Sequence, residues 1–225
     1  MKDSIAIIPA RGGSKRIPGK NLRPFCGRPI IDYPIQTCLT SGLFERVIVS
    51  TDSEAIALEA FKMGVESIQR PKSISGDSSP VTLTVLDTLD FLSNRDVFPT
   101  YVCVLFPTSV FVRKSELEIA KWAMTGNQRD GCISVTPLGV PIQRCLIPNP
   151  QGQLRMVDPG ASLKMGQDLP PGFKDAAQFY WLRVSAFLKT RTLFPENVGV
   201  CVFPKYSVVD IDDDRDWQEA ERKFR

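Results

Sequence analysis

Residues 5–21 read IAIIPARGGSKRIPGKN, and this stretch decides how the rest of the chain is interpreted. The apolar run Ile5–Ile8 is typical of a buried parallel strand, and Pro9 ends it because proline has no N–H for a central ladder. In the loop that follows, glycines allow close backbone approach and successive N–H groups can form an anion-binding nest. The loop also carries four cations, which are Arg11, Lys15, Arg16 and Lys20. A strand followed by such a loop predicts a phosphate site in an α/β protein.

The glycines of this loop fit neither of two common nucleotide motifs. They fall at positions 12, 13 and 19, which is not the Gly-x-Gly-x-x-Gly of dinucleotide-binding proteins. The Gly-Lys-Ser/Thr of a Walker A motif is also missing, which excludes P-loop kinases and GTPases. The alternative to a phosphate site is an ordinary solvated basic loop.

The run IPARGGSKRIPGKN, residues 8–21, resembles the signature of the acylneuraminate cytidylyltransferases, the CMP-sialic acid synthetase family. Members of this family activate nine-carbon acidic sugars with CTP. The enzymes that activate 3-deoxy-manno-octulosonate share part of the signature, so this stretch leaves the sugar open. The resemblance, which extends to about Ala220, implies that the loop binds the nucleotide through Ala10, Arg11, Gly12, Gly13, Ser14, Lys20 and Asn21.

The composition describes an ordinary soluble domain. The 225 residues are 43% apolar and 24% charged, and we expect one domain over residues 1–225, which the resemblance implies is a nucleotidyltransferase domain. A net charge of +3 is too small to indicate a nucleic-acid partner, and no run is long enough for a membrane span or a signal sequence. We therefore expect a cytoplasmic protein with no membrane partner.

Cysteine and histidine usage narrows the chemistry. The six cysteines form no C-x-x-C pair, so we expect reduced thiols and no zinc site. The chain has no histidine, which excludes Ser-His-Asp and Cys-His catalysis and His-ligated metals. Catalysis must therefore rely on carboxylates, lysine, arginine, hydroxyls and a metal held by oxygen atoms.

Short apolar strands alternate with segments of helical periodicity along the chain. This alternation predicts an α/β fold with a doubly wound, Rossmann-like, mostly parallel sheet. The predicted strands cover residues 5–8, 45–51, 65–69, 101–106, 130–136, 178–184, 198–203 and 206–212. The predicted helices cover residues 29–42, 54–63, 82–94, 115–124 and 213–224.

Residues 137–175 interrupt this alternation. Proline and glycine become dense, periodicity fades, and only a short strand around residues 142–147 is expected. A loop of this length inside a compact domain is usually functional. The resemblance implies that it is a sugar-site and dimer-contact insertion, and hence that the protein is a homodimer.

The acidic run VVDIDDD, residues 208–214, is the second candidate for chemistry. If residues 206–212 form a strand, Asp210 and Asp212 project from the same face. Two carboxylates placed there suit Mg²⁺, which also binds the phosphate oxygens of a triphosphate. The alternative is a solvated acidic cap on the last helix. The run resembles the Ile-Asp-Ile-Asp stretch at which the family binds its metal, which implies that Asp210 and Asp212 are the Mg²⁺ ligands.

Arg70-Pro71 followed by Asp77 resembles the family's nucleotide loop. The resemblance implies that Arg70, Asp77 and Ser79 border the cytidine base and ribose. These side chains supply the donors and acceptors that a cytosine edge requires. An ordinary capped loop would also explain them.

Two further stretches concern the sugar. Residues 106–111 and 167–181 resemble the pseudaminic acid branch of the family, although Ala177 stands where that branch has glycine. The resemblance implies sugar contacts from Phe106, Thr108, Gln167, Asp168, Gln178 and Tyr180. The alternative is that the aromatic residues are simply core.

Together these signals predict a CTP-dependent cytidylyltransferase. It would transfer CMP to the anomeric hydroxyl of a nine-carbon acidic sugar, with pseudaminic acid favoured, and release pyrophosphate. Arg11, Lys15 and Lys20 would hold the phosphates, and Asp212 would act with them in catalysis. One alternative is the same reaction on legionaminic, N-acetylneuraminic or 3-deoxy-octulosonic acid; another is a non-catalytic sugar-nucleotide-binding protein.

Overall fold

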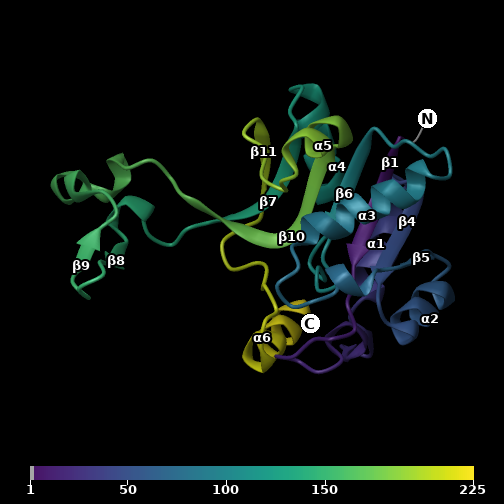
Figure 1. Ribbon diagram of the computed structural model, residues 1–225. Helices are drawn as coiled ribbons and strands as arrows, with labels where there is room; N and C mark the ends of the chain where they lie inside the picture. Colours follow the sequence, from purple (N-terminus) through teal and green to yellow (C-terminus); the bar gives the residue numbers. More distant parts are fainter. Residues whose placement is uncertain (1–2) are drawn as a thin grey trace.

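A seven-stranded sheet forms the centre of the computed structural model, which describes residues 3–225 (Figure 1). The strand order is β11-β7-β10-β6-β1-β4-β5. All neighbours pair in parallel except β10, which is antiparallel to both β6 and β7. This confirms the predicted mostly parallel sheet. The strands are β1 (Ser4–Pro9), β4 (Arg46–Thr51), β5 (Glu66–Gln69), β6 (Tyr101–Leu105), β7 (Gly131–Pro137), β10 (Phe173–Arg183) and β11 (Val198–Val202).

Helices cover both faces of the sheet because side chains of the central strand alternate between two cores. Ala6 and Ile8 of β1 share a core with helices α1, α2 and α4, whereas Ile5 and Ile7 share one with α3 and α5. This is the doubly wound arrangement that the sequence predicts. The helices are α1 (Asp32–Ser41), α2 (Glu54–Lys62), α3 (Val81–Ser93), α4 (Lys114–Gly126), α5 (Val184–Thr190) and α6 (Asp214–Phe224).

The strand predicted at residues 206–212 is wrong. This segment forms no ladder; it begins with Tyr206 at a φ of 66° and continues as a loop. Val209 and Ile211 pack with Trp217 of α6 in a small third core, so their alternation reflects contact with a helix and not a place in the sheet.

Other boundaries also differ from the prediction. The first helix begins at Asp32, not at Pro29, because Pro29 pairs in a hairpin formed by β2 (Pro24–Phe25) and β3 (Arg28–Pro29). Pro34 is accommodated in the first turn, where an N–H has no helical partner. Strand β10 begins five residues early, at Phe173, and α5 was not predicted.

Residues 138–172, here called the arm, project from the sheet between β7 and β10 (Figure 1). A backbone hydrogen bond of 2.9 Å from Leu138 to Gly172 joins its two ends. The strand expected near residues 142–147 is β8 (Leu146–Pro148), preceded by the 3₁₀ turn η3 (Ile142–Arg144) and paired with β9 (Leu154–Met156). Two more 3₁₀ turns, η4 (Pro159–Leu163) and η5 (Gly166–Asp168), complete the arm.

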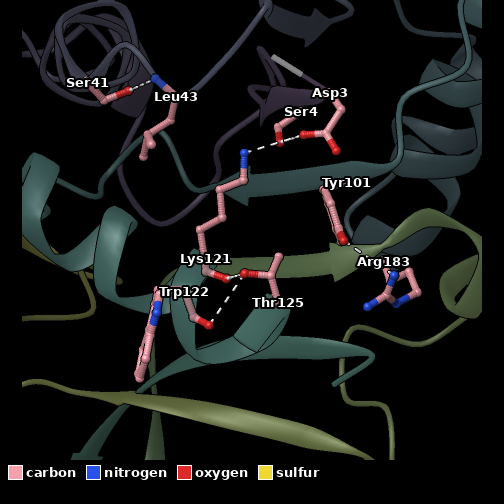
Figure 2. A network of polar contacts seen from close by, with 9 residues as sticks. All are labelled: Asp3, Ser4, Ser41, Leu43, Tyr101, Lys121, Trp122, Thr125 and Arg183. Atoms are coloured by element: carbon pink, nitrogen blue, oxygen red, sulfur yellow. Dashed lines mark hydrogen bonds and ion pairs between the residues drawn. The ribbon is translucent and has the colours of Figure 1, made fainter. Parts of the chain in front are cut away.

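Polar contacts at the amino ends of β1 and β6 tie the sheet to α4 (Figure 2). Lys121 Nζ lies 3.5 Å from Asp3 Oδ1 and 5.7 Å from the ring centre of Trp181. Arg183 Nη1 donates to the Tyr101 hydroxyl at 3.4 Å. These contacts lie at the amino ends of the parallel strands, on the side of the sheet away from the carboxyl ends. We therefore assign them a structural role.

A bulge in β10 gives Ala177 a left-handed backbone. The register with β7 shifts between Asp175 and Tyr180, and Ala177 has a φ of 50°. The Asp175 carboxylate secures the bend by accepting from the Ala177 N–H at 2.9 Å and from the Tyr180 hydroxyl at 2.5 Å. Glycine adopts this backbone freely, whereas alanine is strained in it.

We therefore expect Ala177→Gly to stabilise the fold by about 1 kcal/mol, because glycine relieves more strain than its added chain entropy costs. Urea denaturation would measure the change. Ala176→Gly is the matched control, because Ala176 is buried and is not among the positive-φ residues. That variant should lose stability, and equal effects from the two substitutions would contradict the strain.

Candidate active site

A cavity of about 580 Å³ opens where the segments that follow β1, β5 and β6 meet the loop before α6. It is at the carboxyl edge of the parallel strands, where α/β sheets bind ligands. Twelve of the predicted site residues line it: Arg11, Ser14, Lys15, Lys20, Asn21, Arg70, Asp77, Ser79, Phe106, Thr108, Asp210 and Asp212.

The other predicted site residues do not line this cavity. Ala10, Gln178 and Tyr180 are buried in the fold, and Gly12 and Gly13 are exposed but are not among the lining residues. Gln167 and Asp168 lie in η5 on the arm. The structure thus brings together the predicted phosphate, cytidine and metal residues and separates four of the predicted sugar residues from them.

Asp52, at the end of β4, holds the glycine loop. Its Oδ1 accepts the Gly12 N–H at 2.7 Å, so this amide is already paired. A Cβ on Gly12 would lie 2.9 Å from Ser53 Cβ, so only glycine fits beneath the start of α2. Asn21 Nδ2 donates to the Arg11 carbonyl at 2.9 Å and closes the loop from its other end. Asp52 was not among the residues that the sequence predicted for the site.

The loop cations meet carboxylates from two distant segments. Asp77 binds both Arg11 and Lys15, with its Oδ2 at 2.5 Å from Lys15 Nζ. These two hydrogen-bonded cations lower the pKa of Asp77. On the other side of the cavity, Arg16 Nη2 lies 2.7 Å from Asp212 Oδ1. The sequence analysis assigned no role to Arg16.

Lys20 joins the loop to the acidic segment. Its Nζ donates to the Ile211 carbonyl at 2.7 Å, and burial lowers its pKa although Asp212 and Asp210 oppose this. The segment is also fixed by α6, because Asp216 Oδ2 accepts the Asp212 N–H at 2.9 Å. Asp213 caps α6 in a capping box, as the sequence suggested for the acidic run.

Arg70 forms a wall of the cavity with a guanidinium that is already engaged. The residue is 5% exposed, and its Nη2 donates to the Ser50 carbonyl at 2.6 Å. Burial lowers its pKa, while nearby Asp52 and Asp87 oppose that effect. An arginine remains charged under these conditions, so Arg70 contributes a fixed positive field.

Comparison with known proteins identifies the family of this chain. The family model described as Cytidylyltransferase matches residues 5–213. The chain belongs to the cytidylyltransferase family. The predicted family and the predicted class of enzyme are therefore confirmed.

Two curated relatives match nearly the whole chain. Pseudaminic acid cytidylyltransferase of Campylobacter jejuni is 35% identical over 99% of this chain and 96% of its own length. CMP-N,N'-diacetyllegionaminic acid synthase of Legionella pneumophila is 33% identical over 97% of this chain and 94% of its own length. Among solved structures, CMP:2-keto-3-deoxy-manno-octonic acid synthetase complexed with CTP covers 97% of both chains, with a TM-score of 0.72 and 16% identity. This structural likeness confirms the Rossmann-like fold.

The part of this cytidylyltransferase near Phe106 is aromatic. The Phe106 ring packs edge-on against Tyr180 at 5.6 Å between ring centres, so Tyr180 supports the cavity wall from behind. Burial, followed by the hydrogen bond to Asp175, raises the pKa of Tyr180, which keeps its hydroxyl protonated. Gln178 is 1% exposed, donates to the Ala176 carbonyl at 3.0 Å, and has a buried Oε1 without a partner among the described residues.

A second cavity of about 410 Å³ adjoins the first, and Asp210 lines both. Its other walls come from the base of the arm, from Lys174 and Asp175 at the start of β10, and from Lys205 and Lys223. Asp210 therefore stands between a cation-rich cavity and a pocket of mixed charge. Such a position suits a group that acts between two bound reactants.

Asp210 provides a test of this electrostatic arrangement. Desolvation within the cavity, followed by repulsion from Asp212, raises its pKa, and Lys20 opposes both. The folded state therefore retains the proton more strongly than the unfolded state, and the ionised form reduces stability as pH rises through the folded pKa. We expect Asp210→Asn to raise the urea midpoint modestly at neutral pH, with the gain fading towards about pH 4.

Asp213→Asn is the matched control for this prediction. Backbone N–H groups of Asp216 and Arg215 lower the pKa of Asp213, so its charge stabilises the fold above the unfolded pKa. Asp213→Asn should therefore lower the midpoint at neutral pH, opposite in sign to Asp210→Asn. A loss of stability in Asp210→Asn at neutral pH would contradict the described field.

Proposed function

We propose that this enzyme transfers CMP from CTP to the anomeric hydroxyl of pseudaminic acid. One observation carries the proposal: the loop cations Arg11, Lys15 and Lys20 line the same cavity as Asp210 and Asp212. Arginine and lysine side chains suit the oxygens of a triphosphate, and the two carboxylates suit a Mg²⁺ ion at the α-phosphate, where the reaction takes place. The name and coverage of the Campylobacter relative support pseudaminic acid as the acceptor.

In the proposed reaction, the anomeric oxygen forms a bond to the α-phosphorus of CTP. The bond from that phosphorus to the bridging oxygen of the β-phosphate breaks, and pyrophosphate leaves with the electron pair. The hydroxyl proton passes to solvent or to a carboxylate of the site. Arg11, Lys15 and Lys20 neutralise the growing charge on the leaving pyrophosphate, which is the main contribution that this type of transfer requires from a protein.

Asp210 and Asp212 would hold Mg²⁺. Their carboxylate oxygens fit this ion, which commonly takes one or two protein carboxylates and completes its shell with phosphate oxygens and water. Among residues 3–225 there is no group of three or more Asp, Glu, Cys or His residues that could hold a metal, so the pair needs the substrate phosphates. When bound, the ion would polarise the α-phosphate and lower the pKa of the attacking hydroxyl.

The sugar would lie towards Phe106, with Thr108 beside it in the lining of the first cavity. Gln178 Oε1 is a buried acceptor without a partner among residues 3–225, and a side-chain movement would be needed to present it to an amide N–H of the acyl sugar. The same surroundings would also admit a related nine-carbon acid.

Within residues 3–225, no helix is long and apolar enough to cross a bilayer, and we place the enzyme in the cytoplasm, where CTP is made.

We also propose that two copies associate through the arm. Leucine, valine and methionine side chains on the arm are largely exposed, and Leu163 is 91% exposed. Several exposed apolar side chains on one projecting segment suit an interaction surface. Gln167 and Asp168 lie on the same arm, so dimerisation would be their route to a sugar.

The activity is tested by pyrophosphate release with CTP and Mg²⁺ against pseudaminic, legionaminic, N-acetylneuraminic and 3-deoxy-octulosonic acids. We expect turnover with pseudaminic acid to exceed the others. Turnover with another acid would keep the reaction and change the acceptor. CTP binding without turnover across the panel would favour a non-catalytic sugar-nucleotide-binding protein.

Asp212→Asn should reduce kcat in this assay by about 100-fold or more, because it removes a proposed metal ligand. Asp214→Asn is the matched control, since Asp214 pairs with Arg23 at 2.5 Å and does not line the cavity. That variant should retain nearly full activity. Near-normal turnover of Asp212→Asn would remove the aspartate from the metal assignment.

Leu163→Asp should shift the protein from dimer to monomer in analytical ultracentrifugation, because a charge would replace an apolar contact. Phe61→Asp, at another highly exposed apolar position on α2, is the control that should leave the assembly unchanged. A wild-type monomer, or a Leu163→Asp dimer, would argue against the arm as the interface.

A further inference from the structure

Asp77 forms ion pairs with two of the loop cations that the proposed reaction requires, Arg11 and Lys15. One carboxylate oxygen binds Arg11 and the other binds Lys15, 66 and 62 positions away in the chain. All three side chains line the cavity of about 580 Å³. In this state the two cations face a carboxylate of their own chain, in the place where a phosphate would be expected.

Among residues 3–225, the segment that carries Asp77 has no other long-range hydrogen bond or ion pair of this kind. Its hydrogen bonds within residues 71–79 are local, such as Ser79 N–H to Gly76 at 3.1 Å and Ser75 Oγ to Pro71 at 2.9 Å. In the part of the chain that the structure describes, Asp77 makes the hydrogen bond and ion pairs that tie residues 72–79 to the glycine loop. Release of Asp77 would therefore free this segment without disrupting secondary structure.

The exposure of these pairs makes such an exchange feasible. The side chains of Lys15 and Asp77 are 83% and 40% exposed, so water and counterions can replace the contact readily. Exposed ion pairs contribute little to stability, whereas a polyphosphate offers several anionic oxygens to the same cations. A phosphate chain would therefore displace the carboxylate.

We propose that Asp77 is an internal competitor for the phosphate-binding cations. It holds Arg11 and Lys15 when no nucleotide is bound, yields them to the triphosphate, and takes them back as pyrophosphate leaves. This role rests on the proposed function, because it presupposes that these cations bind phosphate. It makes Asp77 a positioning residue whose charge weakens the hold on product.

The direct test is the affinity for inorganic pyrophosphate, measured by calorimetry with neither CTP nor sugar present. Asp77→Asn keeps the shape of the side chain and removes its charge. We expect it to bind pyrophosphate about three- to tenfold more tightly than the wild type, since two exposed pairs no longer compete. In turnover, its inhibition constant for pyrophosphate should fall by the same factor.

Two controls assign the gain to this contact. Asp214→Asn removes another exposed, ion-paired carboxylate whose partner, Arg23, is not in the cavity lining, and it should leave pyrophosphate affinity unchanged. In a Lys15→Gln background, Asp77→Asn should give a smaller gain than in the wild type, because one of the two cations is already gone.

The outcomes separate this role from the proposed function. If the wild type binds pyrophosphate and Asp77→Asn binds it equally or more weakly, the competitor role is wrong and the phosphate site stands. If the wild type does not bind pyrophosphate at all, the phosphate site itself is wrong. A higher KM for CTP with unchanged pyrophosphate affinity would instead mark Asp77 as a contact to the nucleoside.

Discussion

The site depends on one junction, at which the loop after β1 meets the segment before α6. Lys20 donates to the Ile211 carbonyl at 2.7 Å and Arg16 pairs with Asp212, although nearly the whole chain separates these residues. Beneath them, Ile17 and Ile211 share a buried core with Trp217. Because this core is apolar and closed, the junction holds cations and carboxylates at a fixed separation around one cavity.

The junction also explains how the site accommodates so many charged groups. Each cation of the loop has a carboxylate or carbonyl partner, and these partners come from two distant segments, at Asp77 and at Ile211–Asp212. Lys20 and Asp210 show that this arrangement carries a desolvation penalty. Burial lowers the pKa of Lys20 and raises the pKa of Asp210, so it favours the neutral form of both side chains. A ligand that carries phosphates and a divalent cation would compensate both groups at once, so the cavity is electrostatically prepared for that pair of ligands.

Much of the fold could be predicted from local sequence, because the strands and helices that face the two main cores have clear periodicity. The failures occur where local periodicity is misleading or too short to read. Val209 and Ile211 alternate like a strand but pack against Trp217, and α5 is too short to show a repeat. In the site, the residue types were predictable, whereas the pairing of Asp52 with Gly12 and of Arg16 with Asp212 was not. Such pairings depend on how distant loops meet, which periodicity does not encode.

The residues predicted to contact the sugar are not gathered in one place within this chain. Phe106 and Thr108 line the cavity, but Gln167 and Asp168 lie on the arm and Tyr180 is core. Most large apolar side chains of the arm are exposed, so packing within the arm does not remove them from water. A second copy would cover that surface and bring polar arm residues towards a cavity. Selection of the sugar would then depend on assembly, whereas phosphate binding depends on the junction within each chain.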